Sequence, residues 1–330
     1  MHHPAKDSTR GGDTDAVDLS VVGSGIIGLT VARRLSEAGC DVTLIADRAP
    51  DSTTSMVAAG IWYPYRALPR DRVTDWGART LAALTELAVD PSTGVTIRRG
   101  RELFREPTSD PWWSDAVPHI DRIPAGQLPD GYADGLLLDV PVVDMPRHLT
   151  WLLHELRAAG VASVSRRLDR LEEAGGDLVV NCTGLGAREL VPDPSVTPIR
   201  GQVVIVEQCG IEEWLLDQSD PANLVYAVPR TDTVVLGGTA DEGSDRQDPD
   251  PLVAAGIVER CASLLPTLRD AAIVETRVGL RPSRPAVRLE RSTLLDRRPV
   301  VHCYGHGGAG VTLSYGCAED VVDLVVNYPS

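Results

Sequence analysis

A glycine-rich turn near the amino end constrains the fold of this 330-residue chain more than any other feature. Gly23, Gly25 and Gly28 form a GxGxxG pattern between the apolar run 18–22 and a helical stretch that ends near residue 38. A second apolar run, 42–45, completes a βαβ unit. Such glycines let backbone amides approach a pyrophosphate, and Asp47 can accept ribose hydroxyls. The unit predicts dinucleotide binding, by NAD or FAD, over a turn that merely packs helix on strand.

Composition restricts the partners and the compartment. With a net charge of −15, the chain lacks the cationic field that drives binding to nucleic acids or anionic membranes, so we expect neither. No apolar run approaches the roughly 20 residues of a membrane span. The cysteines form no CxxC pair and we see no secretory leader, so we expect reduced thiols and no metal site. The chain ends in Tyr-Pro-Ser without a peroxisomal signal, and we expect a cytoplasmic protein.

The remaining periodicity predicts an α/β fold with a second kind of sheet. Helices are expected over about 144–159, capped by Asp144, over about 251–265 and after residue 308, and a buried strand over 178–180. Alternating and β-branched runs within 200–238 indicate antiparallel strands instead. We therefore expect a Rossmann-like cofactor-binding domain with an interleaved antiparallel-sheet substrate domain. The cofactor domain would comprise 18–60, 144–199 and 276–330, the substrate domain 61–143 and 200–275, and 1–17 would be a disordered tail.

Three further segments suit a cofactor and an anionic substrate. Residues 53–60, TTSMVAAG, offer hydroxyls for phosphate and small residues beside a flat ring. Residues 304–312, YGHGGAGVT, place a glycine-rich turn before a helix, and the flanking glycines indicate a structural role for His306. In GLRPSRP, Arg281 lies between a glycine and a proline, so we expect a stiff loop that presents a guanidinium to a carboxylate.

Together these motifs identify a family. The segments VVGSGIIGL, IADR, VAAGIWYPY, VVNCTG, RGQ, YAVP before VVLGG, GLRPSRPAVRLER and YGHGGAGVT follow one another from about residue 19 to 326. In order and spacing the chain resembles the D-amino-acid oxidase family. The resemblance implies non-covalent FAD in the Rossmann-like domain. Dimerisation is common in that family, so it also implies a homodimer, although no surface stripe in the sequence marks an interface.

The resemblance assigns roles to individual residues. It implies that Arg281 pairs with the substrate carboxylate, that Tyr226 hydrogen-bonds the same group, and that the Gly308 carbonyl accepts from the substrate amine, while Arg284 is structural. The implied FAD contacts are Gly23, Gly25, Ile26, Ile27, Gly28, Asp47, Arg48, Thr54, Ser55, Ala59, Gly60, Leu168, Thr183, Gly307, Gly310, Val311 and Thr312.

The implied reaction needs no side-chain base. A neutral or hydrophobic D-amino acid would pass a hydride from Cα to flavin N5, and O2 and water would complete its conversion to a 2-oxo acid, ammonia and hydrogen peroxide. The protein would bind only the small amino acid and O2 as reactants.

The chain departs from the family pattern at three places. Ala222 stands in a shortened loop where vertebrate members have a lid tyrosine, and Tyr63 replaces a glutamine, so we expect Tyr63 to line the substrate pocket. Ala240, Asp241 and Glu242 follow the LGGT segment where acidic-substrate members tend to have an arginine. A second carboxylate would be repelled there, which disfavours D-aspartate and D-glutamate.

Several alternatives remain open at this point. Oxidation of glycine, sarcosine or a pathway-specific amino acid, or of D-aspartate, would use the same fold. A dehydrogenase would pass electrons to a quinone or carrier instead of O2. A flavin-binding protein without turnover is the non-enzymatic alternative.

Overall fold

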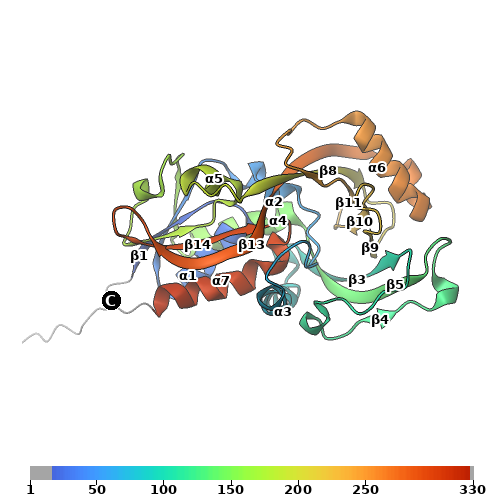
Figure 1. Cartoon of the computed structure of the whole chain (residues 1–330), viewed down its shortest axis with the longest axis horizontal. Coiled ribbons are helices and arrows are strands. Elements are labelled where there is room, and N and C mark those ends of the chain that lie inside the picture. The colour runs from blue at the N-terminus through green and yellow to red at the C-terminus, as the bar shows by residue number, and fades with distance from the viewer. Residues whose placement is uncertain (1–16, 328–330) are drawn as a thin grey trace, which may run out of the picture.

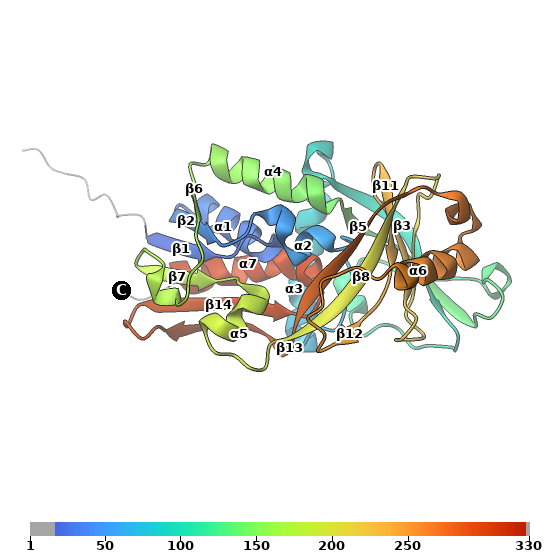
Figure 2. The ribbon, with the colours of Figure 1, turned by 90° about the horizontal axis from the view of Figure 1, so that it is seen from above.

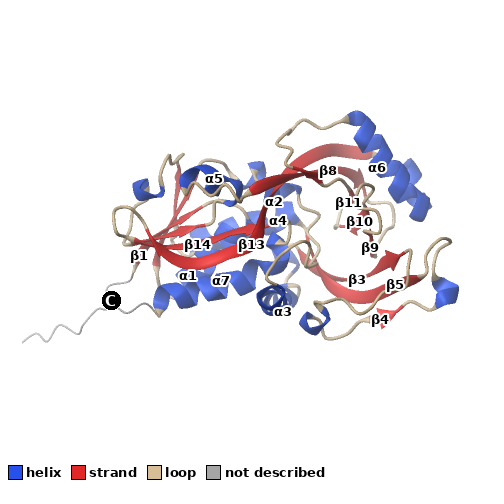
Figure 3. Cartoon of the chain, viewed as in Figure 1, coloured by secondary structure: helices blue, strands red, loops and turns tan. Residues whose placement is uncertain are grey.

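One continuous sheet organises the chain. The computed structural model describes residues 17–327, so the tail expected over 1–17 lies, except for Val17, outside the described residues. The sheet has 14 strands in the order β4-β5-β3-β9-β10-β11-β8-β13-β14-β7-β1-β2-β6, with β12 paired to β8. Its parallel strands lie at one end of the molecule and its mostly antiparallel strands at the other (Figures 1 and 3).

The first end is the predicted Rossmann-like part. Parallel pairs join β14 (Pro299–His306), β7 (Leu178–Asn181), β1 (Asp18–Val22), β2 (Asp41–Ala46) and β6 (Ala162–Ser165). Helices α1 (Ile26–Glu37) and α7 (Gly310–Val326) lie on one side of β14, while the short α5 (Ala187–Leu190) lies on the other (Figure 1). Strands covered on both faces bury nearly every residue, which explains their continuous apolar runs.

The second end is mostly antiparallel. It contains β3 (Val95–Phe104), β4 (Asp121–Arg122), β5 (Asp134–Val143), β8 (Thr197–Glu207), β9 (Trp214–Asp217), β10 (Val225–Pro229), β11 (Thr233–Gly237) and β12 (Asp241–Glu242). Its one parallel pair among the described residues is β3 with β9. Helix α6 (Pro251–Leu264) packs on β8, β10 and β11, while α3 (Arg70–Leu87) packs on β3, β5 and α7. Short 3₁₀ turns occur at Pro50–Ser52, Pro91–Thr93, Ser114–Ala116, Ala125–Gln127, Leu171–Glu173, Gly184–Gly186 and Pro266–Asp270.

Two long strands join the ends, and one of them corrects the sequence analysis. Strand β13 (Ile273–Thr293) runs through the GLRPSRP segment, which was expected to be a loop. Arg281 lies opposite Ile199 in a ladder with β8 that extends over the whole length of β8. The prolines in this segment favour a break in the strand, but the ladder with β8 keeps β13 continuous. The ladder with β14 shifts register between Ser283 and Arg288, and this irregularity accommodates the prolines. The domain limits expected near residues 199 and 275 fall within β8 and β13, and the division stays a proposal.

The other local predictions agree with the structure. Helix α4 (Met145–Ala158), strand β7, helix α6 and helix α7 lie where they were expected, and β10 and β11 form a hairpin around the turn 229–232. Asp144 occupies the cap position of α4, but its side chain makes no capping hydrogen bond. Its carboxylate instead lies 3.5 Å from Arg147. Among the described helices, none is long and apolar enough to cross a membrane.

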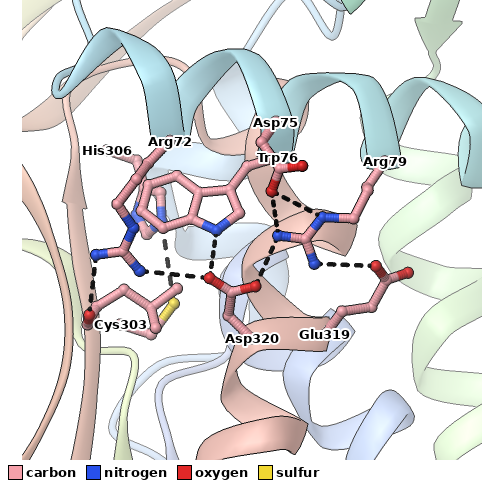
Figure 4. Close-up of polar contacts among 9 residues, drawn as sticks. Arg72, Asp75, Trp76, Arg79, Cys303, His306, Glu319 and Asp320 are labelled. Atoms are coloured by element: carbon pink, nitrogen blue, oxygen red, sulfur yellow. Dashed lines mark hydrogen bonds and ion pairs between the residues drawn. The ribbon is translucent and has the colours of Figure 1, made fainter.

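A polar network holds α3 against α7 beneath the sheet (Figures 2 and 4). The indole of the fully buried Trp76 donates to Asp320 over 2.7 Å, and Arg79 donates to the other oxygen of the same carboxylate over 2.6 Å. Arg79 also bonds Asp75 and Glu319. Asp320 therefore satisfies one buried indole and one partly buried guanidinium at the same time.

Replacing Asp320 by alanine is expected to lower the free energy of unfolding by about 1–3 kcal/mol, because the Trp76 indole loses its partner inside the protein. Asp323→Ala is the matched control, since that aspartate is exposed on the same helix and should change stability by less than about 0.5 kcal/mol. Chemical denaturation of both variants measures the difference. Equal destabilisation by the two substitutions would contradict the assignment.

Candidate active site

A single elongated cavity of about 820 Å³ joins the two ends of the sheet. It begins at the carboxyl ends of β1, β2 and β7, which is where open α/β sheets bind their ligands, and it ends beside β9, β10 and β13. The expected cofactor residues that line it are Gly23, Gly25, Ile26, Ile27, Asp47, Arg48, Thr54, Ser55, Ala59, Gly60, Leu168, Thr183, Gly310 and Val311. Most of the cofactor contacts expected from the sequence therefore lie in the wall of this cavity.

Two helix N-termini open onto this cavity. Helix α1 has Gly25 and α7 has Ala309 at the cap position, and neither helix has a side-chain cap or an acidic residue in its first turn. The amide of Ile26 donates to the Ser55 hydroxyl over 2.9 Å. Uncapped amides carry partial positive charge, so the two helix ends suit the phosphates and the electron-rich ring edge of a flavin nucleotide.

The glycine turn is shaped by close backbone contacts. Gly23 has φ +119°, and a Cβ there would lie 2.4 Å from the Cys182 carbonyl oxygen. A Cβ on Gly28 would lie 1.9 Å from the Gly23 carbonyl oxygen. Side chains at these positions would therefore push α1 away from β1 and β7, and the amides at the start of α1 would move with it.

Three expected cofactor contacts do not reach the cavity wall. Gly28 lies behind the turn and serves helix packing. Gly307 has φ +60°, and its amide donates to the Pro282 carbonyl. The Thr312 hydroxyl donates to the backbone carbonyl of Tyr63 over 2.8 Å and accepts from its amide over 3.0 Å. These residues hold the wall in place from behind.

The three expected substrate-binding residues come together at the far end of the cavity. Arg281 donates to the Thr239 carbonyl over 3.0 Å, and its guanidinium covers Gly201, where a Cβ would lie 2.4 Å away. Gly308 is so close to the side chain of Arg281 that a Cβ there would lie 3.0 Å from Cδ. Burial raises the pKa of Tyr226, an effect that the nearby positive charge of Arg281 opposes. The site thus combines a cation, a neutral phenol and an exposed backbone segment.

Tyr65 is a site residue that the sequence reasoning missed. Its ring centre lies 5.9 Å from the Arg281 guanidinium carbon, and its buried hydroxyl has no hydrogen-bond partner. An unpartnered buried hydroxyl beside the Arg281 guanidinium indicates that a ligand group supplies the missing hydrogen bond. The signal was present in VAAGIWYPY, since Tyr65 follows Tyr63 by two residues.

An aromatic vestibule of about 260 Å³ adjoins this end. Tyr63, Tyr65 and Gln218 line both spaces, and Trp112 and Trp113 line the vestibule. Ala222 is exposed in a turn in which its amide donates to Asp220, and it lines neither space. The shortened loop therefore leaves the aromatic residues at the opening.

Tyr63 lines the cavity as expected, but it does not stand alone. Its hydroxyl donates to Glu102 over 2.7 Å, and the Gln218 amide donates to the same carboxylate oxygen over 3.3 Å. Glu102 is only 3% exposed. No motif in the sequence marked this carboxylate.

The acidic residues expected to repel a second carboxylate are elsewhere. Asp241 and Glu242 form β12, where they bind Arg200 over 3.1 Å and Arg66 over 2.6 Å, and neither they nor Ala240 line the cavity. The expectation that these residues repel a second substrate carboxylate was wrong, because they lie outside the cavity. Pairing with β8 carries them away from the substrate.

A buried cysteine cluster lies behind the glycine turn of β14. Cys303 contacts His306 over 4.0 Å (Figure 4), and the donor atoms of Cys303, His306 and Cys317 all lie within 4.8 Å of one another. The sequence has no CxxC pair, so it gave no sign that the fold brings the two cysteines and the histidine together. That they hold no metal stays a prediction.

Comparison with known proteins identifies the family of this chain. A family model described as FAD dependent oxidoreductase matches residues 18–324, which assigns the chain to that class of enzyme. D-amino-acid oxidases from Rubrobacter xylanophilus and Streptomyces coelicolor are 50% and 45% identical to it, covering 92% and 93% of this chain and 94% and 96% of their own. The chain belongs to the D-amino-acid oxidase family.

More distant relatives share the whole architecture. Human D-aspartate oxidase is 35% identical and covers 94% of this chain and 95% of its own. The crystal structure of glycine oxidase from Geobacillus kaustophilus superposes with a TM-score of 0.79 at 19% identity and covers 96% of both chains. The uncapped helix ends, the glycine turn and the length of the cavity fit FAD, the cofactor of this class.

Gly28→Ala is expected to weaken FAD binding at least tenfold, about 1.4 kcal/mol, because the new methyl group collides with the Gly23 carbonyl. Gly126→Ala is the control, since a Cβ at that position meets no atom within 4 Å. Titration of each apoprotein with FAD, followed by flavin fluorescence, gives both dissociation constants. An unchanged constant for Gly28→Ala would show that the turn does not position the cofactor.

Proposed function

We propose that the protein oxidises the Cα–N bond of a neutral or hydrophobic D-amino acid, with O2 and water, to a 2-oxo acid, ammonia and hydrogen peroxide. The observation that carries the proposal is the convergence of Arg281, Tyr226 and Gly308 at one end of the cavity. The curated relatives named D-amino-acid oxidase support the stereochemistry of the substrate.

The substrate carboxylate would bind at Arg281. The hydrogen bond to the Thr239 carbonyl and the close contact with Gly201 fix the guanidinium on the sheet, and its remaining N–H groups are available for a carboxylate. The phenol of Tyr226 adds a neutral donor, because burial raises its pKa. Tyr65 would supply a further hydroxyl.

The amine would be bound from the opposite side by backbone. The Gly308 carbonyl can accept one amine hydrogen, and this acceptor stays fixed because α7 begins two residues later. FAD, when bound, supplies the two-electron acceptor for the hydride from Cα and transfers the electrons to O2. The chain itself orients the substrate.

A single carboxylate is accommodated more readily than two. Arg66, the next cation near the opening, is already bound to Glu242 over 2.6 Å. D-Aspartate, glycine and sarcosine are the alternative substrates, since relatives that act on D-aspartate or glycine share the fold. A panel of D- and L-amino acids, glycine and sarcosine, mixed anaerobically with the holoenzyme, separates these activities by flavin bleaching. Bleaching by L-amino acids alone would overturn the proposal, and peroxide yield under air tests O2 as the acceptor.

Arg281→Ala is expected to retain FAD but to lose roughly 10²- to 5 × 10³-fold in kcat/KM for a D-amino acid, because the buried carboxylate loses its partner at a cost of about 3–5 kcal/mol. Arg269→Ala, at an exposed position, is the matched control and should keep full activity. Steady-state peroxide formation measures both. Unchanged kcat/KM in Arg281→Ala would remove Arg281 from the site.

A further inference from the structure

A buried carboxylate lies directly behind the wall of the substrate end. Glu102, on β3, reaches the cavity through the side chains of Tyr63 and Gln218, which both line it. The backbone of Tyr63 is held separately by Thr312 on α7. Tyr63 therefore connects the cofactor side of the site with Glu102.

Among the described residues, no cation contacts Glu102. The charged group that acts on Glu102 is Asp217 on β9, itself only 3% exposed, whose carboxylate accepts from Tyr132 over 2.6 Å and from Arg105 over 3.3 Å. Opposite Glu102, β5 places the apolar Leu136, and the buried face of α3 contributes no charged side chain. Burial raises the pKa of Glu102 to about 7, the bonds from Tyr63 and Gln218 oppose that rise, and the charge of Asp217 adds to it.

The direction of the hydrogen bonds determines what the cavity wall offers. Tyr63 gives its only proton to Glu102, so the phenol oxygen has only lone pairs left for a ligand. Gln218 donates one of its two amide hydrogens to Glu102, which leaves its other N–H and its carbonyl oxygen for a ligand. While Glu102 is ionised, the Tyr63 oxygen can only accept hydrogen bonds, and the charge behind Tyr63 and Gln218 is negative.

We propose that Glu102, acting through Tyr63 and Gln218, is a positioning residue that makes this wall reject substrates with a side-chain carboxylate and accept neutral or donor side chains. The inference rests on the proposed function. It gives the discrimination against acidic substrates a different source from Asp241 and Glu242, which lie outside the cavity.

The pH dependence follows from the state of Glu102. Above its pKa Glu102 is charged, and the wall formed by Tyr63 and Gln218 discriminates most strongly against a side-chain carboxylate. Below its pKa Glu102 is protonated, the negative charge is lost and discrimination weakens. A D-glutamate side chain is ionised throughout this range because its own pKa is about 4.3, so the substrate does not cause the change.

The test is the ratio of kcat/KM for D-glutamine to kcat/KM for D-glutamate, two side chains of nearly equal size, measured with the holoenzyme at several pH values. The expected ratio is roughly tenfold larger at pH about 8.5 than at pH about 6, the effect of one nearby charge in a partly shielded site. In Glu102→Gln the ratio falls to its low-pH value and no longer depends on pH.

Tyr63→Phe provides the second variant. It removes a bond that stabilises the ionised carboxylate, so the midpoint of the pH dependence should move upward. A residue with only a structural role would not shift this midpoint. If Glu102→Gln does not fold, the pH profiles of the wild type and Tyr63→Phe decide the question, and a flat wild-type ratio overturns the inference.

Glu242→Gln is the matched control, since Glu242 is exposed and binds only Arg66. It should keep the wild-type ratio and its pH dependence. Turnover of D-alanine separates the two proposals. If the wild type does not oxidise D-alanine or D-glutamine, the proposed function fails, whereas turnover with the same ratio in wild type and Glu102→Gln rejects the role of Glu102 alone.

Discussion

The ladder between β8 and β13 is the constraint on which the site depends. Gly201 and Gly279 lie opposite each other in it, and each admits a side group from another element. The Arg281 guanidinium covers Gly201, while Val57 and Thr54 of α2 (Thr54–Val57) pack against Gly279. The Thr54 hydroxyl also donates to the Leu280 carbonyl over 2.9 Å. The pair of strands β8 and β13 therefore positions both the Arg281 guanidinium and helix α2.

Charge is distributed asymmetrically along the cavity. Helix N-termini without acidic side chains face the cofactor end, and Arg281 provides a fixed cation at the substrate end. Behind the adjoining wall, Glu102 and Asp217 are buried. A zwitterion in such a field has one favourable orientation, with its carboxylate at Arg281. Under the proposed function, orientation by these fixed charges is the contribution of the protein, because the electron acceptor is a cofactor and no side-chain base is assigned.

Sequence reasoning succeeded where the signal was local. GxGxxG, the apolar run ending at Asn181 and the helix beginning near Asp144 each depend on a short stretch of sequence, and each agrees with the structure. It failed where pairing between distant segments decided the outcome. The prolines around Arg281 indicated a loop, but the ladder with β8 kept the strand intact. Glu102 carried no signal, because its importance arises from the approach of Tyr63, which is 39 residues away in the chain.

Tyr63 shows how one substitution in a family pattern changes several contacts at once. Where the resemblance to vertebrate members predicts a glutamine, this chain has a phenol that reaches Glu102, packs edge-on against Trp113 with ring centres 5.5 Å apart, and is tied by its backbone to Thr312. Trp113 in turn packs against Trp62, whose indole donates to the Gly77 carbonyl of α3. Ala222 lines neither the cavity nor the vestibule, whereas Pro221 and Leu224 of the same loop line the vestibule. The aromatic residues Tyr63, Tyr65 and Trp113 line the vestibule beside the substrate end, and under the proposed function the fixed polar groups behind them would select the substrate.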